Sequence, residues 1–579
     1  MSRDKQLSDT RSPLTEALGR VRPVSTHMPR IVGTVVYAVA ILNVASGLTH
    51  GFRGRAHWLG TLMPWGVGNL AAAGMVVFGI LLALLGHGLK RRKLRAWRAA
   101  VPLTIAATVL DAVHSRLGIA IASGLLLYLL LRHRDEFYAA GDPTTRWRAL
   151  WTGVGLFVGS TLIGLGMLSW YDREVIGGWP GIWLALQQVW LGMIGVSGDL
   201  AFRQGRFEDF ISDVLLGLGV VTVLVPIVLA LRSPSPLPHL SQEDEAALRE
   251  MLPAAPDSLG YFNLRRDKSV LWSDSRKAAV AYRVVGGVML ASGDPIGDPE
   301  AWPGAMTNFL LEADRHAWVP AALGCSERAG RAWQRVTDFA AVELGDEAVV
   351  DIETFSLSGR SMRNVRQMVS RVRRAGYETR ILRVRDMTPT ARGELLRDAE
   401  AWRGSETERG FSMALGRVAD PRDPDALIVL AVHEGVVRGF LQFVPWGSDG
   451  ISLDLMRRDR NAEPGINELL IVSVLEAARD LGIHRVSLNF AAFRSVFERA
   501  ERLGAGPVTR FMRRLLGLGS RWFQLESLYR FNSKFHPRWI GRFLVYPSGT
   551  LPRVALAALR AEAFVTRPSL PRLLARKDA

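Results

Sequence analysis

The chain divides into two stretches with different patterns of apolar and polar positions. The first contains six long apolar runs, which begin at Ile31, Trp65, Ala99, Leu117, Ala149 and Phe210. Four of these runs approach the ~20 residues that a helix needs to cross a bilayer. The third and fourth are shorter and are joined only by "HSRLG", which predicts a helical hairpin. The pattern predicts a multi-pass α-helical membrane domain with about six helices at residues 31–231.

Lysine and arginine counts in the loops predict which side of the membrane each end occupies. The basic arm at residues 1–30 has six lysines and arginines, "KRRKLRAWR" also has six, and residues 132–148 have four. The alternate loops have fewer, two in "GFRGRAHW" and three in residues 171–209. The latter loop contains "WLALQQVWLGMIGV", whose length suits an interfacial helix. We therefore expect a protein of the cell membrane with both termini in the cytoplasm.

Beyond a proline-containing linker at residues 232–245, strand-like and helix-like runs alternate. "KAAVAYRVVGGVMLASGD", "ALIVLAVHEGVVRGFLQFVP", "GISLDLM" and "RVSLNFA" are strand-like, whereas "AMTNFLLEADRHA" and "INELLIVSVLEAARDLG" have a helical pattern. This alternation predicts an α/β cytoplasmic domain at residues 246–579. Two similar sets of hairpin, helix and strand, at about residues 246–358 and 377–550, flank a basic helix at residues 359–376. The similarity suggests a duplicated unit.

Composition narrows the partners and the chemistry. The 579-residue chain has a formal net charge of +17, which favours nucleic acid or an anionic membrane surface. Its one cysteine, Cys325, excludes an intramolecular disulfide and a multi-cysteine metal site. The chain lacks a P-loop, a dinucleotide-binding glycine motif, H-E-x-x-H and a nucleophile elbow. It has "RNAEPGIN" where an acyl-CoA acetyltransferase would carry its phosphate loop, so another activated acyl donor is needed.

The predicted helix at residues 359–376 carries basic side chains around an apolar stripe. The stripe consists of Met362, Val365, Val369 and Val372. The basic residues are Arg360, Arg363, Arg366, Arg371, Arg373 and Arg374, with no acid among them in the helix. Arginines without acidic partners repel one another unless phosphates lie nearby, so we expect an RNA-binding helix. The resemblance given below implies that this RNA is a tRNA. A solvated surface helix is the alternative.

A second candidate site begins in "ISLDLMRRDRNAEPGINELL". If residues 450–456 form a strand, Asp454 shares a face with Met456, and Arg458 continues that face while Arg457 opposes it. The helix that follows offers free backbone N–H groups, where a phosphate can bind. An ion pair that holds a loop would explain the same residues.

The third candidate site is "ESLYRFNSKFHPRW", residues 526–539. Arg530, Lys534 and Arg538 recur at every fourth position beside aromatic side chains, until Pro537 ends the helix. A basic stripe beside aromatic rings can bind an anionic headgroup or a terminal nucleotide. An amphipathic helix packed on the core explains the spacing equally well.

With these residues assembled, the chain resembles the MprF (multiple peptide resistance factor) family of aminoacyl-phosphatidylglycerol synthases. The resemblance is greatest to the actinobacterial branch, in which a similar unit is fused to a lysyl-tRNA synthetase. It is carried by "LLLRHRDEFYAAGDP", "RGFSMALGR", "FVPWGSDGISLDLMRRDRNAEPGINELLIV", "RVSLNFAAFRSVFERAERLGAGP" and "RWFQLESLYRFNSKFHPRW". It implies a tandem GNAT-like fold and transfer of an aminoacyl group, lysyl in this branch, from aminoacyl-tRNA to phosphatidylglycerol.

The resemblance also implies roles for individual residues. The family's D-L-M-R motif falls on Asp454 and Arg457, and its K-F motif falls on Lys534 and Phe535. Glu526 lies where this branch has an acidic residue and is a candidate general base. Arg457 or Lys534 would stabilise the oxyanion or bind the headgroup phosphate, and Asp454 would hold the substrate ammonium or orient those cations.

The other cations near these motifs are assigned to the lipid headgroup: Arg458, Arg530 and Arg538. An aminoacyl-tRNA ester is already activated, so the exchange of one ester for another requires no cofactor and no metal. The product would lower the negative charge of the membrane and so confer resistance to cationic peptides.

Two rival functions remain open at this stage. One is aminoacyl-tRNA-dependent transfer to a peptidoglycan precursor, which shares the donor and differs in the acceptor. The other is a lipid transporter or flippase with a regulatory soluble domain. The apolar runs contain few ionisable residues, chiefly Asp111 and His114, where charged cargo would need several. The sequence leaves a homo-oligomer open.

Overall fold

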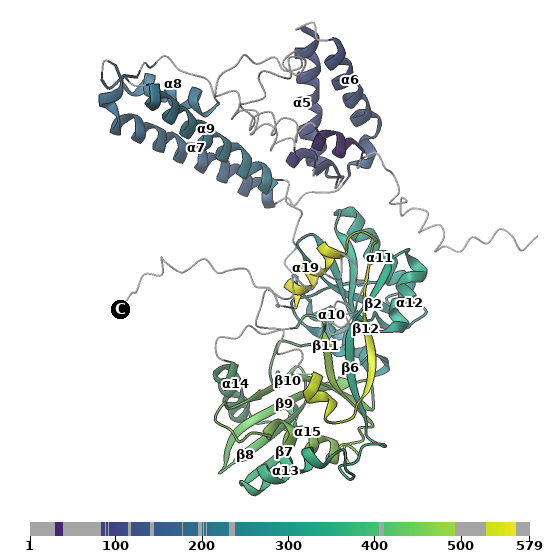
Figure 1. The fold of residues 1–579 in the computed structure, drawn as a ribbon. Coiled ribbons are helices and arrows are strands. Elements are labelled where there is room, and N and C mark those ends of the chain that lie inside the picture. The colour runs from purple at the N-terminus through teal and green to yellow at the C-terminus, as the bar shows by residue number, and fades with distance from the viewer. Residues whose placement is uncertain are drawn as a thin grey trace, which may run out of the picture. The chain divides into compact units, whose positions relative to one another are not determined.

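The computed structural model describes fourteen parts of the chain. They are residue 29 and residues 31–38, 83–86, 88–90, 92–113, 117–138, 144–176, 178–194, 200, 202–203, 205–230, 238–403, 410–492 and 529–562. The chain forms two compact units (Figure 1). The N-terminal unit comprises Gly19–Pro234 with Asp314–Ala317, and most of the remainder belongs to the C-terminal unit.

The described residues of the N-terminal unit are mostly helical, with one isolated β-bridge between Val175 and Phe202. The elements of this unit are α5 (Leu94–Val113), α6 (Leu117–Arg132), α7 (Thr144–Trp170), α8 (Ile182–Met193) and α9 (Gly205–Ala230). Helices α5 and α6 pack as the predicted hairpin, and α8 corresponds to the predicted interfacial helix. Within the described residues, two segments are long and apolar enough to cross a membrane, Ala149–Trp170 and Phe210–Ile227. Most of the predicted spans from Ile31 and Trp65 lies outside the described residues.

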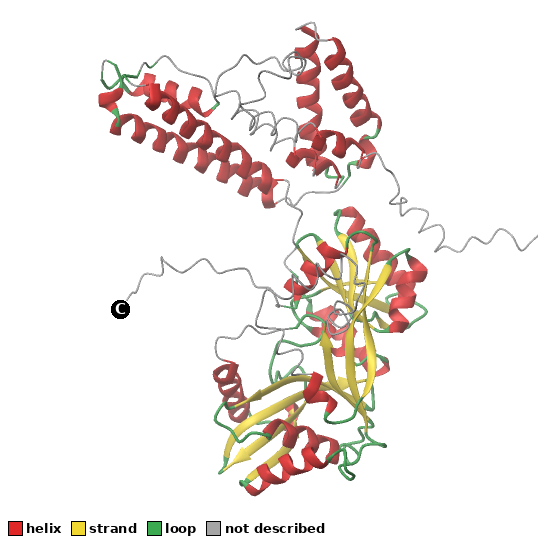
Figure 2. Cartoon of the chain, viewed as in Figure 1, coloured by secondary structure: helices red, strands yellow, loops and turns green. Residues whose placement is uncertain are grey.

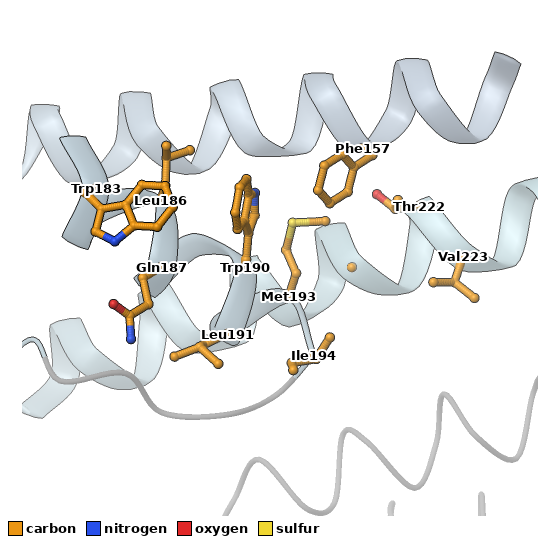
Figure 3. Close-up of a pocket in the computed structure, with 11 residues that line it drawn as sticks. Phe157, Trp183, Leu186, Gln187, Trp190, Leu191, Met193, Ile194, Thr222 and Val223 are labelled. Carbon is orange, nitrogen blue, oxygen red and sulfur yellow. The ribbon is translucent and has the colours of Figure 1, made fainter.

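Helices α7, α8 and α9 line an open apolar pocket of about 500 Å³ (Figure 3). The ring of Trp190 on α8 stacks on Phe157 of α7, with 6.1 Å between ring centroids, and its Nε1 donates to Thr161 Oγ1 at 3.3 Å. Gly192 and Gly219 allow α8 and α9 to approach closely, because a Cβ at either position would collide with the other helix. The packing of these helices therefore depends on small residues, as is common for helices in membranes.

The C-terminal unit is built on one twelve-stranded mixed sheet with helices on its faces (Figure 2). The strand order is β1-β2-β3-β5-β12-β6-β11-β10-β9-β8-β7, and β4 pairs with β2. The first five strands are β1 (Ser269–Trp272), β2 (Ala278–Val285), β3 (Val288–Ser292), β4 (Ile296–Gly297) and β5 (Val319–Cys325). The others are β6 (Ala340–Asp351), β7 (Tyr377–Arg383), β8 (Leu427–His433), β9 (Val436–Trp446), β10 (Gly450–Arg458), β11 (Arg485–Ala492) and β12 (Arg538–Tyr546).

The longer helices alternate with these strands, as the sequence pattern predicts. They are α10 (Gln242–Met251), α11 (Trp302–Arg315), α12 (Glu327–Val336), α13 (Arg363–Arg374), α14 (Pro389–Arg403), α15 (Ile466–Ala477) and α19 (Leu551–Ala561). Helices α13 and α15 lie side by side (Figure 1). The predicted stripe of α13 is buried, since Met362, Val365, Val369 and Val372 are at most 3% exposed.

The sheet is continuous across the predicted boundary between the two units. Strand β6, from the first predicted unit, pairs with β11, whereas β12, from the second, pairs with β5 and β6 (Figure 1). We call β1–β5 with β12 the first half of the sheet, and β6–β11 the second half. Each half contains one parallel pair, β3 with β5 and β10 with β11. The division at the basic helix stays a prediction.

Candidate functional site

The candidate site lies where the parallel strands β10 and β11 separate. They pair only from Gly450 with Arg485 to Ser452 with Ser487. Asp454 follows at a bulge in the pairing of β10 with β9, and Asn489 follows on β11 with a φ of 68°. The Asn489 amide bridges the divergence, because its Nδ2 donates to the Leu453 carbonyl at 2.9 Å. Bulges and left-handed residues of this kind interrupt a ladder and redirect side chains.

Asp454 is partly buried and accepts hydrogen bonds through both oxygens. Oδ1 accepts from the Leu415 N–H at 2.7 Å, and Oδ2 accepts from Gln442 Nε2 at 2.6 Å. Burial raises the pKa of Asp454 to about 6, and these two hydrogen bonds and the charge of Arg417 oppose that rise. The carboxylate therefore changes charge close to neutral pH. Each oxygen keeps a further lone pair for a substrate donor.

Residues 410–419, which we call the strap, are held against this divergence by side chains from distant segments. Gln442 is 2% exposed, and its amide accepts from the Ala419 N–H at 2.8 Å and donates to the Arg417 carbonyl at 2.9 Å. Asn489 Nδ2 donates to the Met413 carbonyl at 2.7 Å. Together with Asp454, these two amides fix the position of the strap beside the diverging strands.

The other end of the strap is anchored by buried charges. Glu562, at the end of α19, accepts from the N–H groups of Phe411 and Ser412 at 2.6 and 3.0 Å, and from Ser412 Oγ. Lys268 lies 4.8 Å from the centre of the Phe411 ring and donates to Ser292 Oγ at 2.7 Å. Burial lowers the pKa of Lys268 to about 7. The strap thus connects the two halves of the sheet.

The bulge changes which cation shares the face of Asp454. Arg457 pairs with Phe440, two positions from Gln442 on β9, so it lies on the same face as Gln442 and Asp454. Met456 and Arg458 lie on the opposite face. The expectation that Arg458 continues the face of Asp454 is therefore wrong, because the extra residue shifts the alternation by one position. Arg457 Nη1 itself donates to the Met456 carbonyl at 3.4 Å.

Lys534 approaches the sheet from the face covered by α15. Its Nζ donates to Glu468 Oε1 at 2.6 Å and lies 5.2 Å from the centre of the Phe531 ring. The Lys534 side chain is 41% exposed, whereas that of Glu468 is 7% exposed, so the ammonium remains accessible to an anion. Arg538 Nε bonds Asp351 at 3.3 Å. The structure therefore places Lys534 and Asp454 on opposite faces of the sheet. Glu526 lies outside the described residues.

Two arginines of the basic helix have acidic partners outside the helix. Arg371 pairs with Glu463, and Arg373 pairs with Glu476 of α15 at 2.8 Å. Arg366 donates to the carbonyls of Leu357 and Gly359. The expectation of six arginines without an acidic partner is therefore wrong for two of them, Arg371 and Arg373. Among the described residues, the other four have no acidic partner: Arg360, Arg363, Arg366 and Arg374.

A buried ionic cluster beneath the divergence was not found from the sequence. Arg542 of β12, 2% exposed, donates to Asp257 at 2.6 Å and to Glu347 at 2.5 and 3.0 Å. Glu347 also accepts from Ser487 Oγ at 2.5 Å, at the last paired position of β11. Burial alone would raise the pKa of Glu347. The charge of Arg542 and the hydrogen bonds from the serine hydroxyls instead hold this pKa below its usual value. The cluster joins the two halves and supports the strand from which Asn489 projects.

Fold and site together define a membrane protein whose C-terminal α/β unit carries a buried acid at two diverging strands. Residues 24–230 match the transmembrane region of lysyl-tRNA synthetase, and residues 249–546 match the C-terminal domain of phosphatidylglycerol lysyltransferase. The chain belongs to the phosphatidylglycerol lysyltransferase family.

Curated relatives support this membership, and a solved structure has the same fold. The lysylphosphatidylglycerol biosynthesis bifunctional protein LysX of Rhodococcus opacus is 42% identical over 86% of this chain and 45% of its own length. LysX of Mycolicibacterium gilvum is 38% identical over 95% of this chain and 51% of its own. The chain thus spans about half the length of these relatives. L-PGS from Bacillus licheniformis, 22% identical over 58% of this chain and all of its own, has the same fold, with a TM-score of 0.50.

Proposed function

We propose that this protein transfers a lysyl group from lysyl-tRNA to the glycerol headgroup of phosphatidylglycerol. The observation that carries the proposal is the partly buried carboxylate of Asp454, with a pKa of about 6, in the domain that matches the lysyltransferase family. The names of the LysX relatives support lysine as the transferred amino acid. We further propose that the C-terminal unit consists of two GNAT-like halves and that the chain crosses the membrane several times with both termini in the cytoplasm.

The reaction exchanges one ester for another. A headgroup hydroxyl attacks the carbonyl carbon of the lysyl ester, the bond to the tRNA ribose oxygen breaks, and the hydroxyl proton ends on that ribose oxygen. The enzyme gains most by holding the two substrates together. In this proposal, ionised Asp454 accepts a hydrogen bond from the attacking hydroxyl or from the substrate ammonium, and both roles require its negative charge.

Cations supply the complementary charge. Arg457, on the face of Asp454, would stabilise the oxyanion, whereas Lys534, half-exposed and held by Glu468 on the opposite face, would bind a substrate phosphate there. Arg360, Arg363 and Arg374 of the basic helix would bind the tRNA backbone. The added lysine makes the lipid cationic, so the membrane would attract cationic peptides less strongly. The exchange needs no cofactor.

Transfer to lipid by membranes that contain the full chain tests this proposal. The membranes are supplied with phosphatidylglycerol and with tRNAs separately charged with labelled lysine, alanine or arginine, and lipids are separated by thin-layer chromatography. We expect label from lysyl-tRNA alone to enter the lipid, and the Asp454→Ala variant to lose the transfer while it still inserts in the membrane. Absence of lipid label from all three tRNAs would refute the proposal and direct attention to peptidoglycan precursors.

A further inference from the structure

Glu562 lies beyond the residues that match the lysyltransferase domain, which end at residue 546, and yet it holds the strap. Glu562 is 1% exposed, and its Oε2 accepts from the Phe411 N–H at 2.6 Å. Its Oε1 accepts from the N–H and the hydroxyl of Ser412, at 3.0 and 2.5 Å. The buried ammonium of Lys268 is attracted to the same carboxylate. A buried carboxylate with three hydrogen-bond donors fixes the backbone that supplies them.

A short stretch of backbone joins the Glu562 contacts to Asp454. The Ala414 carbonyl accepts from Arg265 Nη1 at 3.3 Å, and the N–H of the next residue, Leu415, donates to Asp454 Oδ1 at 2.7 Å. This stretch is therefore held at both ends by carboxyl groups. It has little slack, because each residue of a chain spans at most ~3.3–3.6 Å. Release of one end should therefore move the other.

The charge of Asp454 depends on the hydrogen bond that the strap supplies. Burial favours the neutral acid, and the Leu415 N–H is the strongest of the contacts that favour the carboxylate. The charges of Asp423 and Arg417 act on Asp454 in opposite directions, and these two residues pair with each other at 2.6 Å. Arg457 lies on the same face of the sheet. Loss of the strap contact should therefore favour the neutral acid.

We infer that Glu562 is a positioning residue of the transferase site, which fixes the strap so that the Leu415 N–H stays on Asp454. The inference rests on the proposed function, in which Asp454 acts as a carboxylate. It assigns α19 and its last turn to the transfer reaction as well as to the fold. Without Glu562 the strap loses its anchor, Asp454 takes up a proton at higher pH, and the substrate loses a negatively charged partner.

The pH dependence of lysyl transfer separates this positioning role from a purely structural one. Full-chain enzyme in membranes is assayed for kcat/KM between pH 5 and 8, with phosphatidylglycerol and lysyl-tRNA. In Glu562→Ala, the pH at which kcat/KM falls by half should rise by about one unit, the effect of one lost hydrogen bond to a charged group. The variant should be about tenfold slower at pH 5 and within about twofold of the unmodified enzyme at pH 8. An equal loss at both pH values overturns the inference.

Two further variants keep this test decisive. Glu562→Gln retains the shape and one acceptor oxygen, so its profile should shift in the same direction by about half a unit. If Glu562→Ala does not fold, an unshifted profile in Glu562→Gln overturns the inference. The matched control is Arg553→Met, which removes a hydrogen bond from α19 to the Gly287 carbonyl at 2.7 Å and should leave the profile unchanged. A control that shifts as far as Glu562→Ala also overturns the inference.

Hydrogen exchange in the full chain, measured by mass spectrometry, tests the geometry without any activity. The amides of residues 411–415 should exchange at least tenfold faster in Glu562→Ala, while those of β9 remain protected. Unchanged exchange in the strap overturns the inference even if the pH profile shifts. Failure of the unmodified enzyme to transfer lysine overturns the proposed function instead, whereas faster exchange of the strap would still support its anchoring by Glu562.

Discussion

Replacement of Gln442 by leucine tests whether the strap controls the charge of Asp454. Gln442 donates to Asp454 Oδ2 at 2.6 Å, and this bond favours the ionised carboxylate. A hydrogen bond to a charged group contributes ~1.5–3 kcal/mol, which corresponds to roughly one to two pH units. Without it, the pKa of Asp454 should rise from about 6 to roughly 7–8. The Ala419 N–H would also lose its acceptor, at a cost of about 1–3 kcal/mol in unfolding free energy.

The pH dependence of kcat/KM for lysyl transfer reports this change, because it follows ionisations of the free enzyme. In the unmodified protein the rate should fall as pH drops through about 6, where Asp454 takes up a proton. In Gln442→Leu the same fall should begin one to two units higher. Gln334→Leu, which removes a hydrogen bond to the Phe339 carbonyl at an exposed position, should leave the profile unchanged. A folded Gln442→Leu variant with an unshifted profile would refute the reasoning.

Three further predictions concern buried and exposed charge. The pKa of Lys268 is about 7 in the folded protein and 10.5 ordinarily. Between pH 7 and 10.5 the unfolded chain therefore binds more protons than the folded one. The free energy of unfolding should consequently rise with pH, by up to ~1.4 kcal/mol per pH unit. Lys268→Met should flatten that slope in denaturant titrations from pH 7 to 9, and an unaltered slope would contradict the buried amine. Glu468→Gln should increase reductive methylation of Lys534 several-fold, measured by mass spectrometry against the other lysines, and equal labelling would exclude the ion pair. Arg363→Ala should weaken tRNA binding more than Arg371→Ala at low salt, since Glu463 already neutralises Arg371. The reverse order in filter binding would remove the helix from the tRNA site.

Local patterns were sufficient to predict most elements of the C-terminal unit. The alternating runs at β2, β3, β8, β9 and β11 became strands, and the stripe of α13 is buried. The pairing of strands that are distant in the sequence could not be predicted from local patterns. The insertion of β12 between β5 and β6 joins segments that are far apart in the chain, and no local period encodes such a register.

The site illustrates the same limit. Asp454 was identified from the D-L-M-R motif, but its partners Leu415 and Gln442 lie 39 and 12 residues away. Glu562, which holds the strap, lies 151 residues from Phe411. Arg371 and Arg373 of the basic helix pair with glutamates outside that helix. Counting charges along one helix therefore overestimates the number of arginines that lack an acidic partner. The bulge at Asp454 removes the strict alternation on which the face assignment depended.

Each of the two parallel pairs has a buried or partly buried aspartate just beyond it, and the two aspartates have different partners. Ser292 of β3 and Ser452 of β10 are the last residues of these strands that take part in the parallel pairing, and each is followed two residues later by an aspartate, Asp294 and Asp454. Burial raises the pKa of both carboxyl groups, to about 7 and about 6. Asp294, however, accepts from the N–H and the hydroxyl of Ser326, at 2.7 and 2.6 Å, where that serine caps α12.

Because their partners differ, we expect Asp294 and Asp454 to have different roles. The capping contacts bind the acid of the first half to an adjacent helix, so it stabilises the junction of β5 and α12. The acid of the second half is held instead by the Leu415 N–H of the strap and by the side-chain amide of Gln442. Ser326→Ala should therefore lower stability without changing the pH profile of transfer, whereas Gln442→Leu should change that profile.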